Sequence, residues 1–194
     1  MAQLGFYVDA TKCTGCRTCQ IACKDKNRLD TDIWFREVKS YSVGDFPDVK
    51  GFNLSLSCNH CEHPACVAAC ATGALYKTEE GPVLYDDALC DGCQMCVQFC
   101  PYGQPKFIEE LGVVQKCDSC YAIRKDGGNP VCVDACVMRA LDFGDLDELA
   151  AKYGDDLVCE IPALPSAELT NPHVLIKPKE VMFTPAEELM EFLF

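Results

Sequence analysis

The stretch Cys13-Thr14-Gly15-Cys16-Arg17-Thr18-Cys19, followed by Cys23, introduces a cysteine pattern that recurs along the chain. Its spacing is C-x2-C-x2-C-x3-C, which lets one tight loop present three thiolates to one iron-sulfur cluster. The fourth thiolate comes a helical turn later and points toward a different cluster. This use of the fourth cysteine predicts that such groups work in pairs.

Three more groups of four cysteines follow, and one cysteine is left over. They are Cys58, Cys61, Cys66 and Cys70; Cys90, Cys93, Cys96 and Cys100; Cys117, Cys120, Cys132 and Cys136; and the single Cys159. The third group ends in Cys100-Pro101, which completes the C-x2-C-x2-C-x3-C-P run of bacterial two-cluster ferredoxins. Sixteen cysteines thus predict four clusters, and Cys159, in an apolar setting, is expected to be a buried, inert thiol.

Disulfides and zinc are the alternative uses of these cysteines. Small disulfide-linked domains also carry even numbers of cysteines, but they do not repeat C-x2-C inside every group. A structural zinc site joins two short cysteine knuckles across a longer loop, and the fourth group resembles this arrangement. The first and third groups do not resemble a zinc site, since three cysteines placed at every third residue surround a cubic iron-sulfur cluster better than a single ion. A zinc-stabilised interaction scaffold is the alternative from a different functional class.

The composition indicates an acidic protein whose fold depends on metal. The 194 residues are 49% hydrophobic, but this share includes seventeen cysteines. The other apolar side chains make a thin core, so we expect the metal-free chain to be largely unfolded. A net charge of −13 argues against nucleic acid as a partner. No apolar run reaches ~18 residues and no export signal opens the chain, so we expect no membrane span and export only together with a partner.

Short strands and helices are predicted around the cysteine groups. Strands are expected at 5–9 and 52–57, hairpins at 74–85 and 106–116, and helices at 18–28, at 64–70 with Pro64 in the first position, and from Asp145 to a stop at Gly154. Each cysteine group then belongs to a strand-loop-helix unit, and the chain holds four such units.

The C-terminal segment changes in composition. Prolines at 162, 165, 172 and 178 predict an extended arm with little core-forming power. Thr184-Pro185-Ala186-Glu187 offers a capping box, which predicts a last helix that runs to Phe194. We expect so apolar an end either to fold back on this chain or to grip another subunit.

Several polar residues lie close to the cysteines. His60 and His63 fall inside the second group, but four cysteines already saturate a cluster, so we expect both to pack or to form hydrogen bonds. A cation beside a cluster stabilises its reduced state. The candidates for this role are Lys12, Arg17, Lys24 and Lys116. The alternative is that they are ordinary surface charges. Trp34 and Arg36 are candidates for a partner-facing position, with a packed Trp34 as the favoured alternative.

No catalytic motif accompanies the cysteines. The sequence has neither G-x-G-x-x-G nor a P-loop, and no cysteine except Cys159 is left for nucleophilic chemistry. We therefore expect a non-catalytic electron carrier that needs an enzyme at one end and an electron donor or acceptor at the other.

The order of the groups, with four residues between Cys61 and Cys66 and eleven between Cys120 and Cys132, resembles the iron-sulfur (beta) subunit of the dimethyl sulfoxide reductase family of molybdopterin oxidoreductases. The phrases that carry the resemblance are 58–66, 116–120, 139–144, Asn171-Pro172-His173 and Ile176-Lys177-Pro178. Only the terminal helix falls outside it. The resemblance implies an α+β fold of two fused bacterial-ferredoxin-like 2×[4Fe-4S] modules with pseudo-twofold symmetry, short hairpins and helices, and an extended C-terminal arm.

The resemblance also implies domains and ligands. Residues 1–51 and 102–158 would form the first module, 52–101 the second, and 159–194 the arm and terminal helix. The implied ligand sets are Cys13, Cys16, Cys19 and Cys136 for cluster 1; Cys23, Cys117, Cys120 and Cys132 for cluster 2; Cys58, Cys61, Cys66 and Cys100 for cluster 3; and Cys70, Cys90, Cys93 and Cys96 for cluster 4. Related nitrate reductases have tryptophan at the position of Cys93 and lose one iron there, so four [4Fe-4S] clusters are expected here.

Such subunits relay electrons between a molybdopterin-containing catalytic subunit and, usually, a quinol-oxidising membrane subunit in anaerobic respiration. The resemblance implies that cluster 1 lies nearest the molybdenum and cluster 4 nearest the membrane partner. It further implies membrane association through partners, on the extracytoplasmic face after co-export with the catalytic subunit. The alternative is the beta subunit of a soluble cytoplasmic molybdoenzyme of the transhydroxylase or dehydroxylase type.

Overall fold

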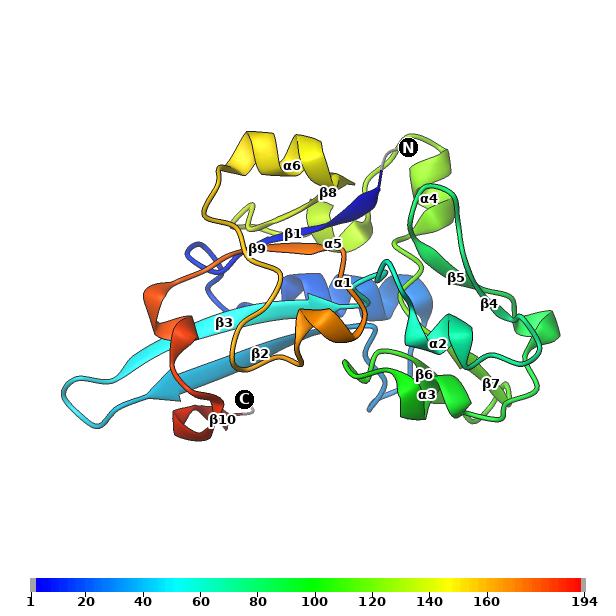
Figure 1. The fold of residues 1–194 in the computed structure, drawn as a ribbon, viewed down its shortest axis with the longest axis horizontal. Coiled ribbons are helices and arrows are strands. Elements are labelled where there is room, and N and C mark those ends of the chain that lie inside the picture. The colour runs from blue at the N-terminus through cyan, green and yellow to red at the C-terminus, as the bar shows by residue number, and fades with distance from the viewer. Residues whose placement is uncertain (1–2, 193–194) are drawn as a thin grey trace.

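The computed structural model describes residues 3–192, and its central sheet joins three distant parts of the chain (Figure 1). Strand β1 (Leu4–Asp9) lies in the middle, antiparallel to β8 (Leu141–Asp145) and parallel to β9 (Val174–Lys177). Five of its six residues are buried, which explains the apolar run at 6–8. The predicted first strand is confirmed, and it holds the two ends of the fold together.

Helix α6 (Leu146–Tyr153) packs against this sheet. The Asp145 carboxylate accepts hydrogen bonds from the backbone N–H groups of Asp147 and Glu148, which caps the helix where the sequence predicted. The Tyr153 ring stacks on Tyr7 with a centroid distance of 3.7 Å. The helix therefore covers one side of β1.

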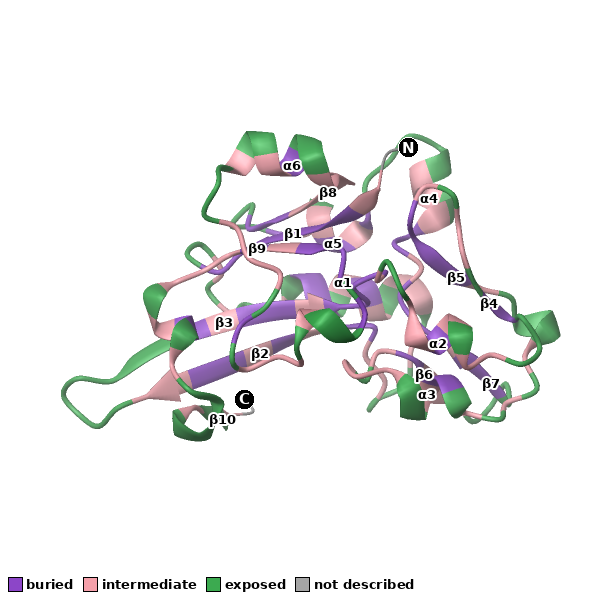
Figure 2. Ribbon diagram, viewed as in Figure 1, coloured by how far each residue is buried: buried purple, intermediate pink, exposed green. Residues whose placement is uncertain are grey.

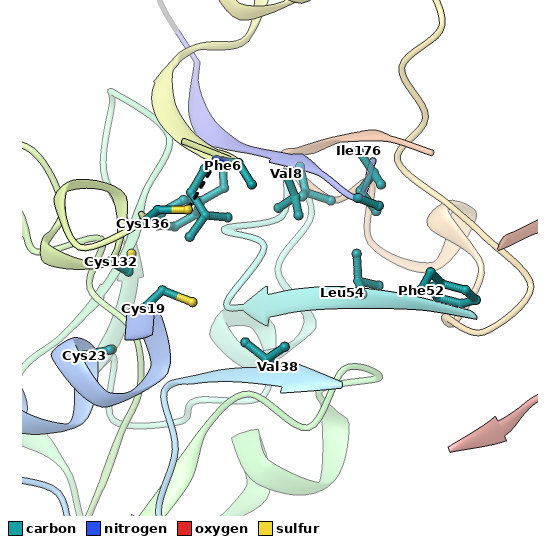
Figure 3. Close-up of a cluster of buried hydrophobic side chains, with 14 of the residues drawn as sticks. Phe6, Val8, Cys19, Cys23, Val38, Phe52, Leu54, Cys132, Cys136 and Ile176 are labelled. Carbon is teal, nitrogen blue, oxygen red and sulfur yellow. Dashed lines mark hydrogen bonds between the residues drawn. The ribbon is translucent and has the colours of Figure 1, made fainter. Parts of the chain in front are cut away.

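A long hairpin made by β2 (Arg36–Val43) and β3 (Lys50–Ser57) extends from the body of the molecule (Figure 1). Its tip is exposed, whereas its base is buried (Figure 2). At the base, Leu54 and Phe52 join Val8 and Ile176 in one apolar cluster (Figure 3). Helix α1 (Thr18–Asn27) is the helix predicted for the segment that carries Cys19 and Cys23, and it lies beside β2.

The second half of the fold is made of small hairpins and short helices around its own core. The elements are α2 (Ala65–Ala68), β4 (Leu75–Lys77), β5 (Val83–Tyr85), the 3₁₀ helix η1 (Asp87–Leu89), α3 (Met95–Phe99), β6 (Lys106–Ile108) and β7 (Val113–Gln115). Both predicted hairpins are confirmed, β4 with β5 and β6 with β7. Helix α2 is shorter than predicted, and Pro64 stands before it as the N-cap residue. The helices α4 (Tyr121–Lys125) and α5 (Val131–Asp134) then lead back to the central sheet.

The C-terminal segment folds back on the chain and helps to build its core. Ile161, Val174, Ile176 and Met182 are at most 5% exposed, so the prediction of little core-forming power is wrong. The segment runs through three 3₁₀ helices, η2 (Ala167–Leu169), η3 (Glu180–Phe183) and η4 (Ala186–Glu188). Of the two fates expected for the apolar end, the structure shows the first.

The predicted terminal helix is wrong over the described residues. After η4 the chain forms strand β10 (Met190–Phe192), antiparallel to the edge of β2; the last two residues of the expected helix, Leu193 and Phe194, lie outside the described part. A segment this short is a marginal helix, while the edge of β2 offers unpaired backbone groups. An ion pair between Glu191 and Lys39, 3.1 Å long, adds to the pairing. Within residues 3–192, none of the helices has the length and apolar character of a membrane span.

Candidate iron-sulfur sites

Twelve of the sixteen grouped cysteines surround three separate cavities. The cavities are lined by Cys13, Cys16, Cys19 and Cys136; by Cys58, Cys61, Cys66 and Cys100; and by Cys70, Cys90, Cys93 and Cys96. We call these sets 1, 3 and 4. In each set, three cysteines come from one loop and the fourth comes from the end of another group.

The other four cysteines, set 2, are Cys23, Cys117, Cys120 and Cys132. All four are at most 8% exposed. Burial and the charges on Cys132 and Cys120 raise the pKa of Cys23 to about 12. Figure 3 shows Cys19 and Cys23 near Cys132 and Cys136, at one end of the apolar cluster. Helices α1 and α5 bring these residues together.

The first and third cysteine loops share one backbone conformation. Gly15 and Gly92 have φ of 72° and 70°, and two residues later Arg17 and Gln94 have φ of 61° and 59°. Left-handed residues at these places wrap the loop around its cavity. A helix begins directly afterwards in both loops, α1 and α3. Two segments far apart in sequence therefore build the same cradle.

Backbone and side-chain N–H groups point at the sulfur of the fourth cysteine of every group. The donor–acceptor distances are 3.6 Å for Asn27 Nδ2 to Cys23, 3.4 Å for Leu75 N to Cys70, 3.5 Å for Gln104 N to Cys100, and 3.2 Å for Ala140 N to Cys136. Such donors stabilise thiolate and the reduced, more negative form of a bound cluster. Each fourth cysteine is thus prepared as a ligand.

Burial raises the pKa of several thiols in the sets. It raises the pKa of Cys66 to about 12 and of Cys61 and Cys96 to about 11, and neighbouring cysteine charges add to the rise. Thiols with such pKa values hold their protons at neutral pH, and ligation requires that cations replace those protons. Four iron ions bridged by sulfide supply that positive charge, so the donor set fits a [4Fe-4S] cluster. Over residues 3–192, no three His, Cys, Asp or Glu side chains converge as ligands of a single metal ion.

Exposure differs among the sets. Cys16 of set 1 and Cys93 of set 4 are exposed, whereas every cysteine of set 2 is buried. Cys159 belongs to none of the sets and is half-buried, so it is less buried than predicted. Sets 1 and 4 therefore meet the surface, and set 2 is enclosed by protein.

The histidines of the second group line none of the three cavities. His60 is fully buried, and its Nδ1 accepts a hydrogen bond from the Val83 N–H at 3.0 Å. Burial, together with the charge of Lys116, lowers its pKa well below the usual value, so the ring is neutral. His63 is exposed. The expected packing role of His60 is confirmed.

Of the four predicted cations, two line cavities. Arg17 borders the cavity of set 1, and Lys116 borders that of set 3. Lys116 is only 1% exposed, and its ammonium group donates to the carbonyls of Val83 and Cys117. Lys12 pairs with Asp9 at 3.1 Å. Lys24 lies 4.0 Å from the centroid of the Trp34 ring, and this contact holds the tryptophan against α1.

Arg36 is the residue near the cysteines that sequence reasoning placed wrongly. A partner-facing position was one expectation, yet Arg36 is 1% exposed. Its register explains this, because it pairs with Ser57 at the base of the hairpin, next to Cys58. The alternation of Arg36, Val38 and Ser40, all buried, was the available signal.

Comparison with known proteins agrees with this geometry. The 4Fe-4S dicluster domain family matches residues 49–146, and the 4Fe-4S binding domain family matches 10–26, so all sixteen grouped cysteines lie in matched segments. The B subunit of anaerobic dimethyl sulfoxide reductase from Escherichia coli (strain K12) is 44% identical over 184 residues, which cover 91% of this chain and 89% of that protein. The chain belongs to the iron-sulfur subunits of the dimethyl sulfoxide reductase family.

Two further relatives show a similar likeness. The corresponding B subunit from Haemophilus influenzae is 41% identical over 189 residues, 93% of this chain and 91% of that protein. Protein NrfC of Escherichia coli (strain K12) is 38% identical over 148 residues, 74% of this chain and 66% of that protein. The family predicted from the cysteine motifs is confirmed, and with it a 4Fe-4S electron-transfer role and a mixed α and β fold of ferredoxin-like domains.

Proposed function

We propose that this chain holds four [4Fe-4S] clusters and relays electrons between a molybdopterin-containing catalytic subunit and a quinol-oxidising membrane subunit. One cluster would be ligated by each of sets 1, 2, 3 and 4. The observation that carries the proposal is that three cavities are each lined by four cysteines, drawn three and one from different groups. In this assignment the chain itself is non-catalytic.

The protein's part in the relay is to hold each cluster and set its potential. A bound cluster supplies one-electron redox chemistry. The sixteen thiolates would anchor the irons, and the N–H groups of Leu75, Gln104 and Ala140 would stabilise the reduced state from the protein side. Burial of set 2 keeps water away from the middle of the relay.

The contacts between sets support the order 1-2-3-4. The charge on Cys132 of set 2 raises the pKa of Cys19 of set 1. Charges on Cys23 of set 2 and Cys58 of set 3 both raise the pKa of Cys117. Helices α2 and α3, which carry cysteines of sets 3 and 4, are in contact. Electrons would then enter and leave at sets 1 and 4, the two sets with an exposed cysteine.

Exposed apolar side chains support docking of a partner at each end. Near set 1, Val137 and Met138 are 65% and 42% exposed. Near set 4, Phe99 and Met95 are 54% and 39% exposed. Apolar patches of this kind favour protein–protein contact. We assign the end at set 1 to the catalytic subunit and the end at set 4 to the membrane subunit, in a complex on the extracytoplasmic face after co-export.

Iron and sulfide analysis of anaerobically purified complex tests the proposal. Four clusters require about sixteen irons and as many sulfides per chain, with four reduced-state signals in electron paramagnetic resonance (EPR). A molybdopterin-containing polypeptide should copurify. One zinc per four cysteines without sulfide would refute the assignment and favour the zinc scaffold.

A further inference from the structure

The guanidinium of Arg36 is buried at the base of the hairpin made by β2 and β3. Its NH1 donates to the Ser55 carbonyl at 3.2 Å and to the Ser55 hydroxyl at 3.0 Å, and its NH2 donates to the Ser57 hydroxyl at 2.8 Å. The group also lies over the Phe6 ring, 4.6 Å from its centroid. Every one of these contacts is electrically neutral.

The charge of Arg36 has no carboxylate to balance it. None of the ion pairs among residues 3–192 includes Arg36, and its Nε has no hydrogen-bond partner there. Arginine keeps its proton in proteins, so the positive charge stays. A buried charge is strongly unfavourable unless an opposite charge lies close to it. The fold therefore requires an anion beside Arg36.

The groups that can supply this anion are cysteines of two sets. Burial lowers the pKa of Arg36, but charges on Cys132, Cys19, Cys117 and Cys23 outweigh that effect and raise it. Cys19 belongs to set 1 and the other three to set 2. Geometry gives the same answer for set 1, since the Ser55 hydroxyl that binds Arg36 lies 3.3 Å from Cys19 Sγ. For set 2, Cys23 comes one turn later on α1, and it lies with Cys132 in the same buried cluster as Cys19 and Phe6. In Figure 3, Phe6, over whose ring Arg36 lies, is at the cysteine end of the apolar cluster.

We propose that Arg36 is a positioning residue that acts as one counter-cation for two iron-sulfur clusters, those of sets 1 and 2. This inference rests on the four-cluster function proposed above. A fixed positive charge makes each cluster easier to reduce, and it weakens the repulsion between two neighbouring reduced clusters. One electron leaves one cluster as it enters the other, and Arg36 keeps its proton throughout. Because both clusters share the cation, its field raises both potentials and leaves the transfer between them nearly unbiased.

Lys26 provides a matched control. Its charge lowers the pKa of Cys23, and that of Cys120, so it also acts on set 2. Unlike Arg36, it is partly exposed and lies 3.8 Å from the Asp118 carboxylate. Water and a paired carboxylate screen such a charge strongly. Substitution of Lys26 and substitution of Arg36 by neutral residues therefore remove the same charge, but we expect different effects on the cluster potentials.

The test is EPR-monitored redox titration of the complete complex, with the variants Arg36→Met, Arg36→Lys and Lys26→Gln. In Arg36→Met, we expect the midpoint potentials of two of the four clusters to fall by at least about 59 mV. For a one-electron couple, this shift is a tenfold change in the reduction equilibrium. Arg36→Lys keeps the charge and should restore most of the shift. Lys26→Gln should change the reduction equilibrium of any cluster by less than about threefold, because water and Asp118 screen the charge of Lys26.

The outcomes separate this proposal from the one it rests on. Full iron content with four unchanged midpoints in Arg36→Met would overturn the role of Arg36 and leave the four clusters in place. Equal shifts in Arg36→Met and Arg36→Lys would show a structural role only. Fewer than about sixteen irons in the wild type would instead refute the four-cluster function. If Arg36→Met fails to assemble, Ser57→Asp neutralises the guanidinium in place, and it must lower the same two midpoints or the proposal is wrong.

Discussion

Substitution of Gly92 by alanine should remove one cluster site selectively. Gly92 has φ of 70°, and a Cβ there would lie 2.4 Å from the backbone oxygen of Gly112. Gly112 cannot move freely, because it sits in the turn between β6 and β7. The neighbouring Val114 N–H donates to Cys90 Sγ at 3.3 Å, so a displaced turn also disturbs a ligand of set 4.

The magnitude follows from comparison with Gly73. Gly73 has φ of 72° but no atom within 4 Å of an added Cβ, so alanine there costs only the left-handed backbone, about 1–2 kcal/mol. Gly92→Ala adds a collision with backbone, for which overpacking gives roughly another 1–3 kcal/mol. This additional 1–3 kcal/mol corresponds to a roughly 5- to 150-fold change in the equilibrium between the intact and the disrupted site.

The assay is the rate of iron release from the anaerobic complex in mild denaturant, with iron per chain measured on isolation. Gly92→Ala should lose set 4 iron fastest and leave about twelve irons in place, since each cluster holds four. Gly15→Ala should be intermediate, because its Cβ would meet the Asn53 side chain at 2.5 Å. Asn53 can rotate away at the cost of its 2.7 Å hydrogen bond with the Ser40 hydroxyl. Equal iron loss from Gly73→Ala and Gly92→Ala would refute the reasoning.

Three further changes test other parts of the structure. Cys93→Trp should convert the cluster of set 4 to a three-iron form and leave three EPR signals intact, and a change in all four signals would contradict the ligand assignment. Ile176→Ala, at a fully buried position of β9, should cost about 2–5 kcal/mol and lower the apparent Tm by roughly 5–15 °C, whereas the half-buried Leu175→Ala should do less. Glu191→Pro should abolish the pairing of β10 with β2 and increase light scattering at unchanged iron content. Glu191→Ala keeps the backbone pairing and removes the side-chain contacts alone, which are the ion pair with Lys39, worth about 0–1 kcal/mol, and the hydrogen bond with Tyr41.

The local structure around the cysteines was predictable because short-range chemistry decides it. The x2 spacings, Gly15 and Gly92 favour the loop conformation, and Pro101 prevents α3 from continuing past its C-cap residue, Cys100. The Asp145 cap and the two small hairpins follow from patterns within about ten residues. The division of sixteen cysteines into four groups along the chain needed no knowledge of distant contacts, whereas the assignment of each fourth cysteine to another group came from the family resemblance.

What the sequence did not predict depends on partners far along the chain. Met190 and Phe192 fit a strand or a helix, and only the free edge of β2 decides between them. Val174 and Ile176 alternate with other residues as buried positions of a strand do, but the prolines around them favoured the prediction of an extended arm. The burial of Arg36 becomes visible only once Ser57 is known to lie opposite.

The position of β1 between β8 and β9 has a consequence for biosynthesis. Strand β1 is flanked by strands that end at Asp145 and Lys177, so the central sheet cannot close until translation has passed Lys177. At about 5–20 residues per second, this leaves the N-terminal cysteine loop waiting for roughly 8–35 s. For most of that interval Cys13, Cys16 and Cys19 are without Cys136, so the nascent chain depends on whatever protects free thiols from oxygen and delivers iron once Cys136 has been made.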